Sequence, residues 1–112
     1  MSCVFCQILS GHIPSKAIYE DEKTYAFMDI NPQAPSHILV IPKIHVADTT
    51  EALLHEGLAE ACLYACVKAA TIVKIKNTGF RISVNNGADA CQSVQHLHFH
   101  VLGGGPLSEK MA

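Results

Sequence analysis

The sequence lacks the features that mark nucleic-acid-binding, membrane-spanning, secreted and disordered chains. Its 112 residues carry 8 Lys and Arg against 10 Asp and Glu, and Arg81 is the only arginine, so the basic footprint of a nucleic-acid-binding protein is missing. No apolar stretch approaches the roughly 18 residues of a membrane span, and no cationic region followed by an apolar segment marks a signal peptide. A charged fraction of 16% beside 49% hydrophobic residues excludes disorder. We therefore expect a soluble cytoplasmic domain with no nucleic-acid and no membrane partner.

The cysteines do not form a disulfide framework. Five is an odd number, and without a signal peptide reduced thiols are expected. Cys62 and Cys66 lie four residues apart in an Ala-rich helical stretch, where they are expected to fill the core. Cys3 and Cys6 form a Cys-x-x-Cys pair, which has the spacing of two metal ligands but is also compatible with a surface thiol pair or a redox pair.

The pattern of apolar residues predicts one α+β domain over residues 1–112. Alternation and β-branched or aromatic runs favour strands, and the connections between them are typical of hairpins in an antiparallel sheet. Strands are expected at residues 16–20, 23–30, 37–41, 80–85 and 95–102, with a short helix at 3–10 and a long helix at 49–76.

The long helix is predicted from capping residues and an apolar stripe. Asp48 and Glu51 have capping-box spacing, and Asn77-Thr78-Gly79 is a typical helix end. The stripe at three- and four-residue spacing predicts one buried face, and it consists of Leu54, Leu58, Ala61, Ala65, Ala69, Ile72 and Val73.

The last predicted strand carries three alternating histidines. Side chains alternate faces along a strand, so His96, His98 and His100 are expected on one face, with Leu97, Phe99, Val101 and Leu102 burying the other. Three imidazoles are poor core material, and a row of them on a hydrophobic anchor indicates a site.

Two kinds of chemistry suit such a row. Three imidazoles can ligate zinc and leave an open catalytic position. Alternatively, a neutral imidazole with a pKa near 6.5 can attack phosphorus or an acyl carbon. The surroundings favour the second use. Ser93 offers a hydroxyl to an oxyanion or leaving group, Asn85 ends the preceding strand, and Asp29 beside the apolar Phe27 and Ile30 suits a ribose diol next to a purine.

Several motifs together resemble a known family. His96-Leu97-His98-Phe99-His100-Val101-Leu102 is similar to the histidine-triad (HIT) signature, in which histidines alternate with apolar residues. The segments 13–15, 26–30, 32–43 and 103–104 resemble the Hint branch of purine nucleoside phosphoramidases. The resemblance covers about residues 3–108 and implies the HIT-like fold, with a homodimer as the usual assembly.

The resemblance also implies roles for individual residues. His98 matches the nucleophile that becomes nucleotidylated, His100 the group that holds the phosphate, Ser93 the contact to the phosphoryl group and leaving amine, and His37 an additional histidine behind the triad. Asp29 matches the residue that binds the ribose hydroxyls. The expected nucleotide-binding surface comprises Val4, Phe5, Ile8, Phe27, Asp29, Ile30, Asn85, Ser93, Val94, His98 and His100.

The implied activity is hydrolysis of the P–N bond of purine nucleoside 5′-phosphoramidates, such as AMP joined to an amine or to lysine. Two alternatives stay open. One is a dinucleoside polyphosphate hydrolase or nucleotidyl transferase of a sister branch, and the other is a non-catalytic protein that binds purine nucleotides.

The resemblance gives the Cys-x-x-Cys pair two partners. Many bacterial HIT proteins bind structural zinc with such a pair, a histidine after the Ile-Pro-Lys strand and the first triad histidine. Cys3, Cys6, His45 and His96 fill these four positions. We therefore expect structural zinc and no organic cofactor. A site of this kind uses His96, which weighs against a catalytic zinc tripod on the triad.

Overall fold

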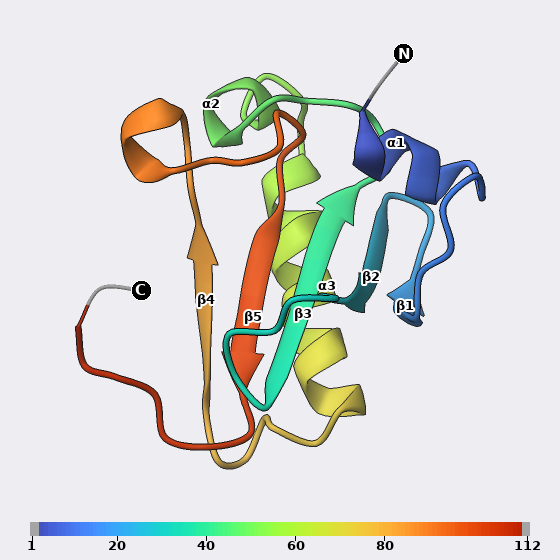
Figure 1. The fold of residues 1–112 in the computed structure, drawn as a ribbon. Coiled ribbons are helices and arrows are strands. Elements are labelled where there is room, and N and C mark those ends of the chain that lie inside the picture. Colours follow the sequence, from blue (N-terminus) through green and yellow to red (C-terminus); the bar gives the residue numbers. More distant parts are fainter. Residues whose placement is uncertain (1–2, 111–112) are drawn as a thin grey trace.

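The computed structural model describes residues 3–110, which form a five-stranded antiparallel sheet with helices on both faces (Figure 1). The strands are β1 (Ala17–Glu20), β2 (Thr24–Met28), β3 (Ser36–Pro42), β4 (Phe80–Val84) and β5 (Phe99–Gly103), in the spatial order β1-β2-β3-β5-β4. The predicted α+β class and antiparallel sheet are confirmed. No helix within the described residues has the length and apolar character needed to cross a membrane.

The main core lies between one face of the sheet and helix α3 (Leu58–Ile72). Alternate residues of β3 and β5, such as Ile38, Val40, Phe99 and Val101, pack against the helix. Cys62 and Cys66 are buried in this core, as predicted, and burial raises the pKa of both thiols to about 12. They are therefore neutral packing groups.

The other face of the sheet is partly covered by helix α1 (Val4–Leu9). Phe5 of this helix forms a second apolar cluster with Phe27, Leu39 and Ile41 of β2 and β3. The intervening residues of β3 belong to the main core, so the alternation of this strand buries side chains on both faces. The histidines lie on the face that carries α1.

The predicted helix over 49–76 is wrong in its extent, because the chain forms two helices there. Helix α2 (Thr49–Ala52) begins at Asp48, whose carboxylate accepts a hydrogen bond from the Glu51 backbone N–H at 3.0 Å. In a capping box the Glu51 carboxylate would accept a hydrogen bond from the backbone N–H of Asp48. Here it accepts from the backbone N–H of Ala47 instead. The chain then turns, and α3 starts after Gly57, which has a φ of 77°.

The break changes which residues of the predicted stripe are buried. Leu54 lies in the connection between the helices and is 82% exposed, while Ile72 in the last turn is also exposed. The helix ends at Ile72 instead of at residues 77–79, because Lys74 adopts a left-handed conformation with a φ of 66°. The described part of the chain therefore has three α-helices, not one long and one short helix, and a 3₁₀ turn η1 (Ala88–Ala90).

The histidine segment is also paired differently from the prediction. Only Phe99–Gly103 joins the sheet as β5, because residues 95–98 lie opposite the loop that follows β3, where the Leu97 N–H donates to the Val46 carbonyl at 2.7 Å. Leu97 still points into the main core. Leu102 lines a hollow together with His100, so its predicted place on the opposite face is wrong.

The left-handed backbone at Gly57 supplies the first stability prediction. An added Cβ would find only the end of Lys23 nearby, at 3.8 Å, so Gly57→Ala should cost about 1 kcal/mol through backbone conformation alone. Gly105→Ala is the matched control, because its Cβ makes an ordinary 3.5 Å contact with Pro35 and should change stability by less than about 0.5 kcal/mol. Urea unfolding measures both, and equal losses would contradict the assignment.

Candidate functional site

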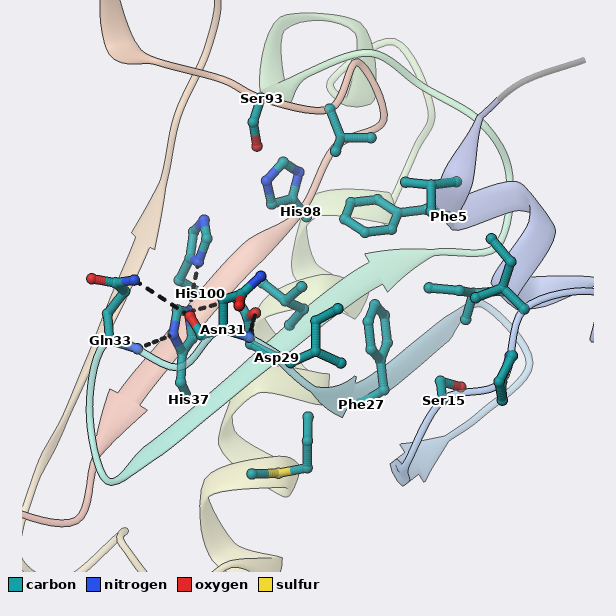
Figure 2. Close-up of a pocket in the computed structure, with 18 residues that line it drawn as sticks. Phe5, Ser15, Phe27, Asp29, Asn31, Gln33, His37, Ser93, His98 and His100 are labelled. Atoms are coloured by element: carbon teal, nitrogen blue, oxygen red, sulfur yellow. Dashed lines mark hydrogen bonds and ion pairs between the residues drawn. The ribbon is translucent and has the colours of Figure 1, made fainter.

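Three histidines reach one cavity: His37 from β3, His100 from β5, and His98 from just before β5. His100 lies on β5 opposite Leu39 of β3, and His37 lies opposite Leu102, so His37 and His100 are diagonal neighbours across the pair. This brings their rings to 5.1 Å between centroids, and the ring of His98 lies 5.1 Å from that of His100. Figure 2 shows these three side chains with Asp29 around the cavity.

The cavity has a volume of about 460 Å³, and one end of it is apolar. Its size suits a nucleotide-sized ligand. All the predicted catalytic residues and all the predicted nucleotide-binding residues except one line it. The lining residues that were predicted are Val4, Phe5, Ile8, Phe27, Asp29, Ile30, His37, Ser93, Val94, His98 and His100.

The exception is Asn85. It lines an adjacent hollow beside β4, which also includes Gln33, His37 and His100. The structure thus places Asn85 next to the cavity but not in its wall. Asn85 comes just after β4 and two residues after Ser83, so the two positions share one face of the sheet. Ser83 lies opposite His100.

A hydrogen bond determines which nitrogen of His98 faces the cavity. His98 is 5% exposed, and its Nδ1 lies 2.8 Å from the carbonyl oxygen of His96. A carbonyl only accepts, so Nδ1 must carry the proton. The neutral ring therefore keeps its lone pair on Nε2, as a nucleophile requires.

A second set of hydrogen bonds determines the tautomers of His37 and His100. The Gln33 backbone N–H donates to Nδ1 of His37 at 2.9 Å, so neutral His37 carries its proton on Nε2. That Nε2–H donates to Nδ1 of His100, also at 2.9 Å. Neutral His100 must then carry its own proton on Nε2, which makes this nitrogen a hydrogen-bond donor.

Asp29 lies where the cavity meets the histidines. Its Oδ1 accepts from the Asn31 backbone N–H at 2.8 Å, and its Oδ2 lies 3.4 Å from Nε2 of His37. The carboxylate is therefore held in place by the loop that follows β2. It lies at the cavity wall together with Phe27 and Ile30.

Burial keeps the site histidines neutral. Burial lowers the pKa of His37 and of His98 below the ordinary 6.5, although the Asp29 charge acts in the opposite direction on both. At His100, burial together with the neighbouring imidazoles of His98 and His37 lowers the pKa to about 4. At neutral pH, His98 is thus uncharged with a free lone pair on Nε2, and His100 is an uncharged hydrogen-bond donor.

Some contributors were not predicted from the sequence. Gln33 acts through its backbone N–H, which no side-chain pattern reveals. Ser15 and Ile13 also line the cavity, and Ser15 is held by the hydroxyl of Tyr25 at 2.6 Å. The only available signal was the Ile13-Pro14-Ser15 motif and the two prolines of segment 31–35, which indicate ordered loops.

The four predicted metal ligands also come together. The Cys3 Sγ lies 3.4 Å from Nδ1 of His96, and the Cys6 Sγ lies 3.3 Å from Nδ1 of His45 and 3.6 Å from that of His96. Tetrahedral zinc with bonds of about 2.3 Å to sulfur and 2.0–2.1 Å to nitrogen separates such ligands by about 3.6 Å. The donor set and spacing therefore fit zinc.

His96 is oriented for this cluster by a further contact. Its Nε2 lies 3.0 Å from the Pro42 carbonyl, which leaves Nδ1 unprotonated toward the two cysteines, as in many metal-bound histidines. Within residues 3–110, the side chains close enough to share a metal form two groups, Cys3-Cys6-His45-His96 and Asp29-His37-His100. Neither group contains all three triad histidines, so the alternative of a zinc tripod on the triad is disfavoured.

Comparison with known proteins identifies the family. The family model described as HIT domain matches residues 10–107. The chain belongs to the HIT domain family. The "14 kDa zinc-binding protein" of Zea mays is 45% identical over 103 residues, which cover 90% of this chain and 80% of that protein. The predicted membership of the HIT superfamily is thus confirmed.

Solved HIT structures match the whole described fold. A HIT family hydrolase from Clostridium thermocellum superposes with a TM-score of 0.94 at 40% identity and covers 99% of this chain and 97% of that chain. A histidine triad nucleotide-binding protein from Candida albicans gives 0.83 at 34% identity and covers 99% and 87%. These values confirm the predicted HIT-like fold.

The depressed pKa of His100 predicts a pH-dependent stability of the HIT fold. Because the folded value of about 4 lies below the unfolded value near 6.5, the unfolded chain binds more protons between these values, and stability falls as the pH drops through this window. From this residue alone, the wild type should lose about 2 kcal/mol between pH 7 and pH 5.

The variant His100→Asn should lack this component of the pH dependence. Urea unfolding of each protein at both pH values measures it, since groups distant from residue 100 cancel when the two differences are compared. His55→Asn changes an exposed histidine between α2 and α3 and should keep the wild-type dependence. The same pH dependence in all three proteins would contradict the assignment.

Proposed function

We propose that the protein hydrolyses the P–N bond of purine nucleoside 5′-phosphoramidates through a nucleotidylated His98. One observation carries the proposal: Nδ1 of His98 donates its hydrogen bond to the carbonyl of His96. This leaves Nε2, with its lone pair, free to react with a ligand in a nucleotide-sized cavity. The hydrolase name of the Clostridium thermocellum neighbour and the nucleotide-binding name of the Candida albicans neighbour agree with it.

The cavity suggests how a nucleotide would bind. The apolar end, where the Phe5 and Phe27 rings lie 5.8 Å apart, suits the flat face of a purine. Asp29 suits the two ribose hydroxyls, since a carboxylate accepts two hydrogen bonds. The 5′-phosphate would then lie at His98 and His100, with the Ser93 hydroxyl near the leaving amine (Figure 2).

The first chemical step is a displacement at phosphorus. His98 Nε2 attacks the α-phosphorus and forms a P–N bond, while the bond from phosphorus to the amine breaks. The amine nitrogen keeps the electron pair of the broken bond and takes up a proton from water. The His100 Nε2–H donates to a phosphate oxygen, where negative charge must be stabilised.

The second step releases the nucleotide. The adduct carries a positive imidazolium, because His98 retains its Nδ1 proton, and this makes His98 a good leaving group. Water attacks phosphorus, the P–N bond to His98 breaks, and the ring recovers its lone pair as the water releases a proton. One hard displacement thus becomes two easier ones.

We also propose a structural zinc at Cys3, Cys6, His45 and His96. The spacing of the four ligand atoms and the zinc-binding name of the Zea mays relative support it. When bound, zinc supplies a positive charge for two thiolates and four bonds that join distant segments. The ligands tie the start of α1 to the loop after β3 and to residue 96, while His98 remains free for chemistry.

The activity is tested with adenosine 5′-phosphoramidate and measurement of AMP release. His98→Ala should lower kcat/KM by at least about 10³-fold, because the nucleophile is lost, while AMP binding persists. His55→Ala changes an exposed histidine outside the cavity and should keep wild-type turnover.

The outcomes separate the alternatives. Near-full activity of His98→Ala would overturn the mechanism. Release that a chelator stops before the protein unfolds would favour a metal at the reacting atoms. Saturable AMP binding without turnover of any phosphoramidate would favour a binding protein, and cleavage of dinucleoside polyphosphates alone would favour the sister-branch activity.

The structural zinc makes a separate prediction. One zinc per chain should be found by elemental analysis, and its removal should lower Tm by roughly 10 °C while catalysis at low temperature changes less. Cys6→Ser should abolish the bound zinc, whereas Cys91→Ser, at an exposed cysteine outside the cluster, should retain it. Equal loss of stability and of low-temperature activity, or loss of neither, would contradict a structural role.

A further inference from the structure

A second hollow adjoins the triad on the side of β4. It has a volume of about 330 Å³, and Gln33, His37 and His100 line both this hollow and the nucleotide-sized cavity. Figure 2 shows these three residues together at one side of the cavity, toward the strand labelled β4 in Figure 1. The two spaces therefore adjoin at Gln33, His37 and His100; we call the first the apolar arm and the second the β4 arm.

The two arms differ in chemical character. The first contains the aromatic rings and Asp29, whereas the β4 arm presents polar side chains and two cations, Arg81 and Lys110. Within residues 3–110, no Asp or Glu lines the β4 arm, and neither cation forms an ion pair. This is notable in a chain with more acidic than basic residues.

The strand register explains how Arg81 reaches this place. Phe80, Ile82 and Val84 pack against the main core, so Arg81 and Ser83 point to the face that carries the triad. Ser83 lies opposite His100, and Arg81 lies opposite Leu102. Arg81, the chain's only arginine, thus lies on β4 two residues from Ser83, the residue opposite His100.

The C-terminal segment closes the β4 arm and orients the guanidinium. After β5 the chain passes the end of β4 and turns alongside it (Figure 1), where Leu107, Ser108 and Lys110 line the hollow. One Arg81 nitrogen, Nη2, donates to the Ser108 carbonyl at 2.6 Å. Arginine has five N–H donors in a rigid fork, so donors remain for a ligand.

We propose that the β4 arm binds the leaving group and that Arg81 and Lys110 select an amine that bears a carboxylate. The inference rests on the proposed function. With the nucleoside in the apolar arm and phosphorus beside His98 and His100, the β4 arm is the remaining space next to the reacting bond. A free carboxylate matches the arginine fork with two parallel hydrogen bonds.

The class of substrate follows from this pairing. It is a nucleoside 5′-phosphoramidate whose nitrogen belongs to an amino acid with a free carboxylate. Attack by His98 breaks the bond between phosphorus and that nitrogen, which leaves with the electron pair and takes a proton from water, so that the amino acid is released. Water then breaks the P–N bond to His98 and releases the nucleotide. A second nucleoside fits less well, because Leu102 and Leu107 are the only large apolar side chains among residues 3–110 that line the β4 arm.

The test compares two substrates that differ only in charge. AMP joined through nitrogen to β-alanine is compared with the same compound carrying a neutral carboxamide. For the wild type, kcat/KM should be at least about tenfold higher for the carboxylate. Arg81→Gln should bring the ratio close to one, and Lys110→Gln should lower it partly. A folding defect in a variant does not change the ratio, because both substrates are measured with the same enzyme preparation. The control variant is Lys68→Gln on α3, which should keep the wild-type ratio.

The outcomes distinguish this inference from the proposed function. Turnover of unsubstituted phosphoramidate with a wild-type ratio near one overturns the leaving-group site alone. If neither compound is turned over, the proposed function fails, and the dissociation constants of the same two compounds then test the β4 arm. Binding of the carboxylate compound about tenfold tighter than the carboxamide supports the leaving-group site, and equal binding overturns it. A third outcome is that the wild type cleaves diadenosine polyphosphate faster than the carboxylate substrate and that Arg81→Gln slows this cleavage. The β4 arm would then bind phosphate, and its assignment to a carboxylate would be overturned.

Discussion

The 2.8 Å hydrogen bond from Nδ1 of His98 to the carbonyl of His96 is the contact on which the site depends. It determines which nitrogen of His98 faces the cavity, and the position of the accepting carbonyl determines where that nitrogen lies. The carbonyl belongs to a residue whose own ring is buried and held at both nitrogens, by Pro42 on one side and by the two cysteines on the other. The Leu97 N–H bond to Val46 anchors the peptide that carries the same carbonyl.

The cysteine cluster and His98 are consequently joined through one residue. The side chain of His96 belongs to the cluster, and its main chain belongs to the site. Under the proposed function, a metal held by the cluster would stiffen His98 without approaching the reacting atoms, because rigidity of a supporting residue is what holds a catalytic group in position. Phe5 completes the link, since its ring packs edge-on against both His96 and His98.

The sequence predicted the faces of the strands better than the ends of the helices. Alternation alone placed His96, His98 and His100 on one side, and this survived even though residues 95–98 pair with a loop instead of a strand. The helix at 49–76 was wrong because apolar periodicity continues through a region where Gly57 and Lys74 adopt left-handed backbone. A periodic pattern records which side chains prefer burial, but not where the backbone turns.

Within the site, side-chain roles could be inferred and backbone roles could not. The triad, His37 and Asp29 were predicted from residue type and from family resemblance, and His37, His98, His100 and Asp29 line one cavity. The Gln33 N–H, which determines the tautomers of His37 and His100, belongs to a group that every residue except proline has, so no sequence pattern marks it. The metal cluster joins residues up to 93 positions apart, and only the family resemblance linked His45 and His96 to the cysteine pair.

The polarity of the site face changes steadily from β2 to β4, and the chemistry follows from this change. Aromatic side chains on β2 lie beside apolar side chains on β3, then beside the imidazoles of His100 on β5 and of His98 just before it, and finally beside Ser83 and Arg81 on β4. Neutral histidines need the apolar side, because burial is what lowers their pKa. Charge that develops during displacement needs the polar side. A triad located between the two can stay uncharged at rest and still act next to cationic groups, which a uniformly apolar or uniformly polar cavity would not allow.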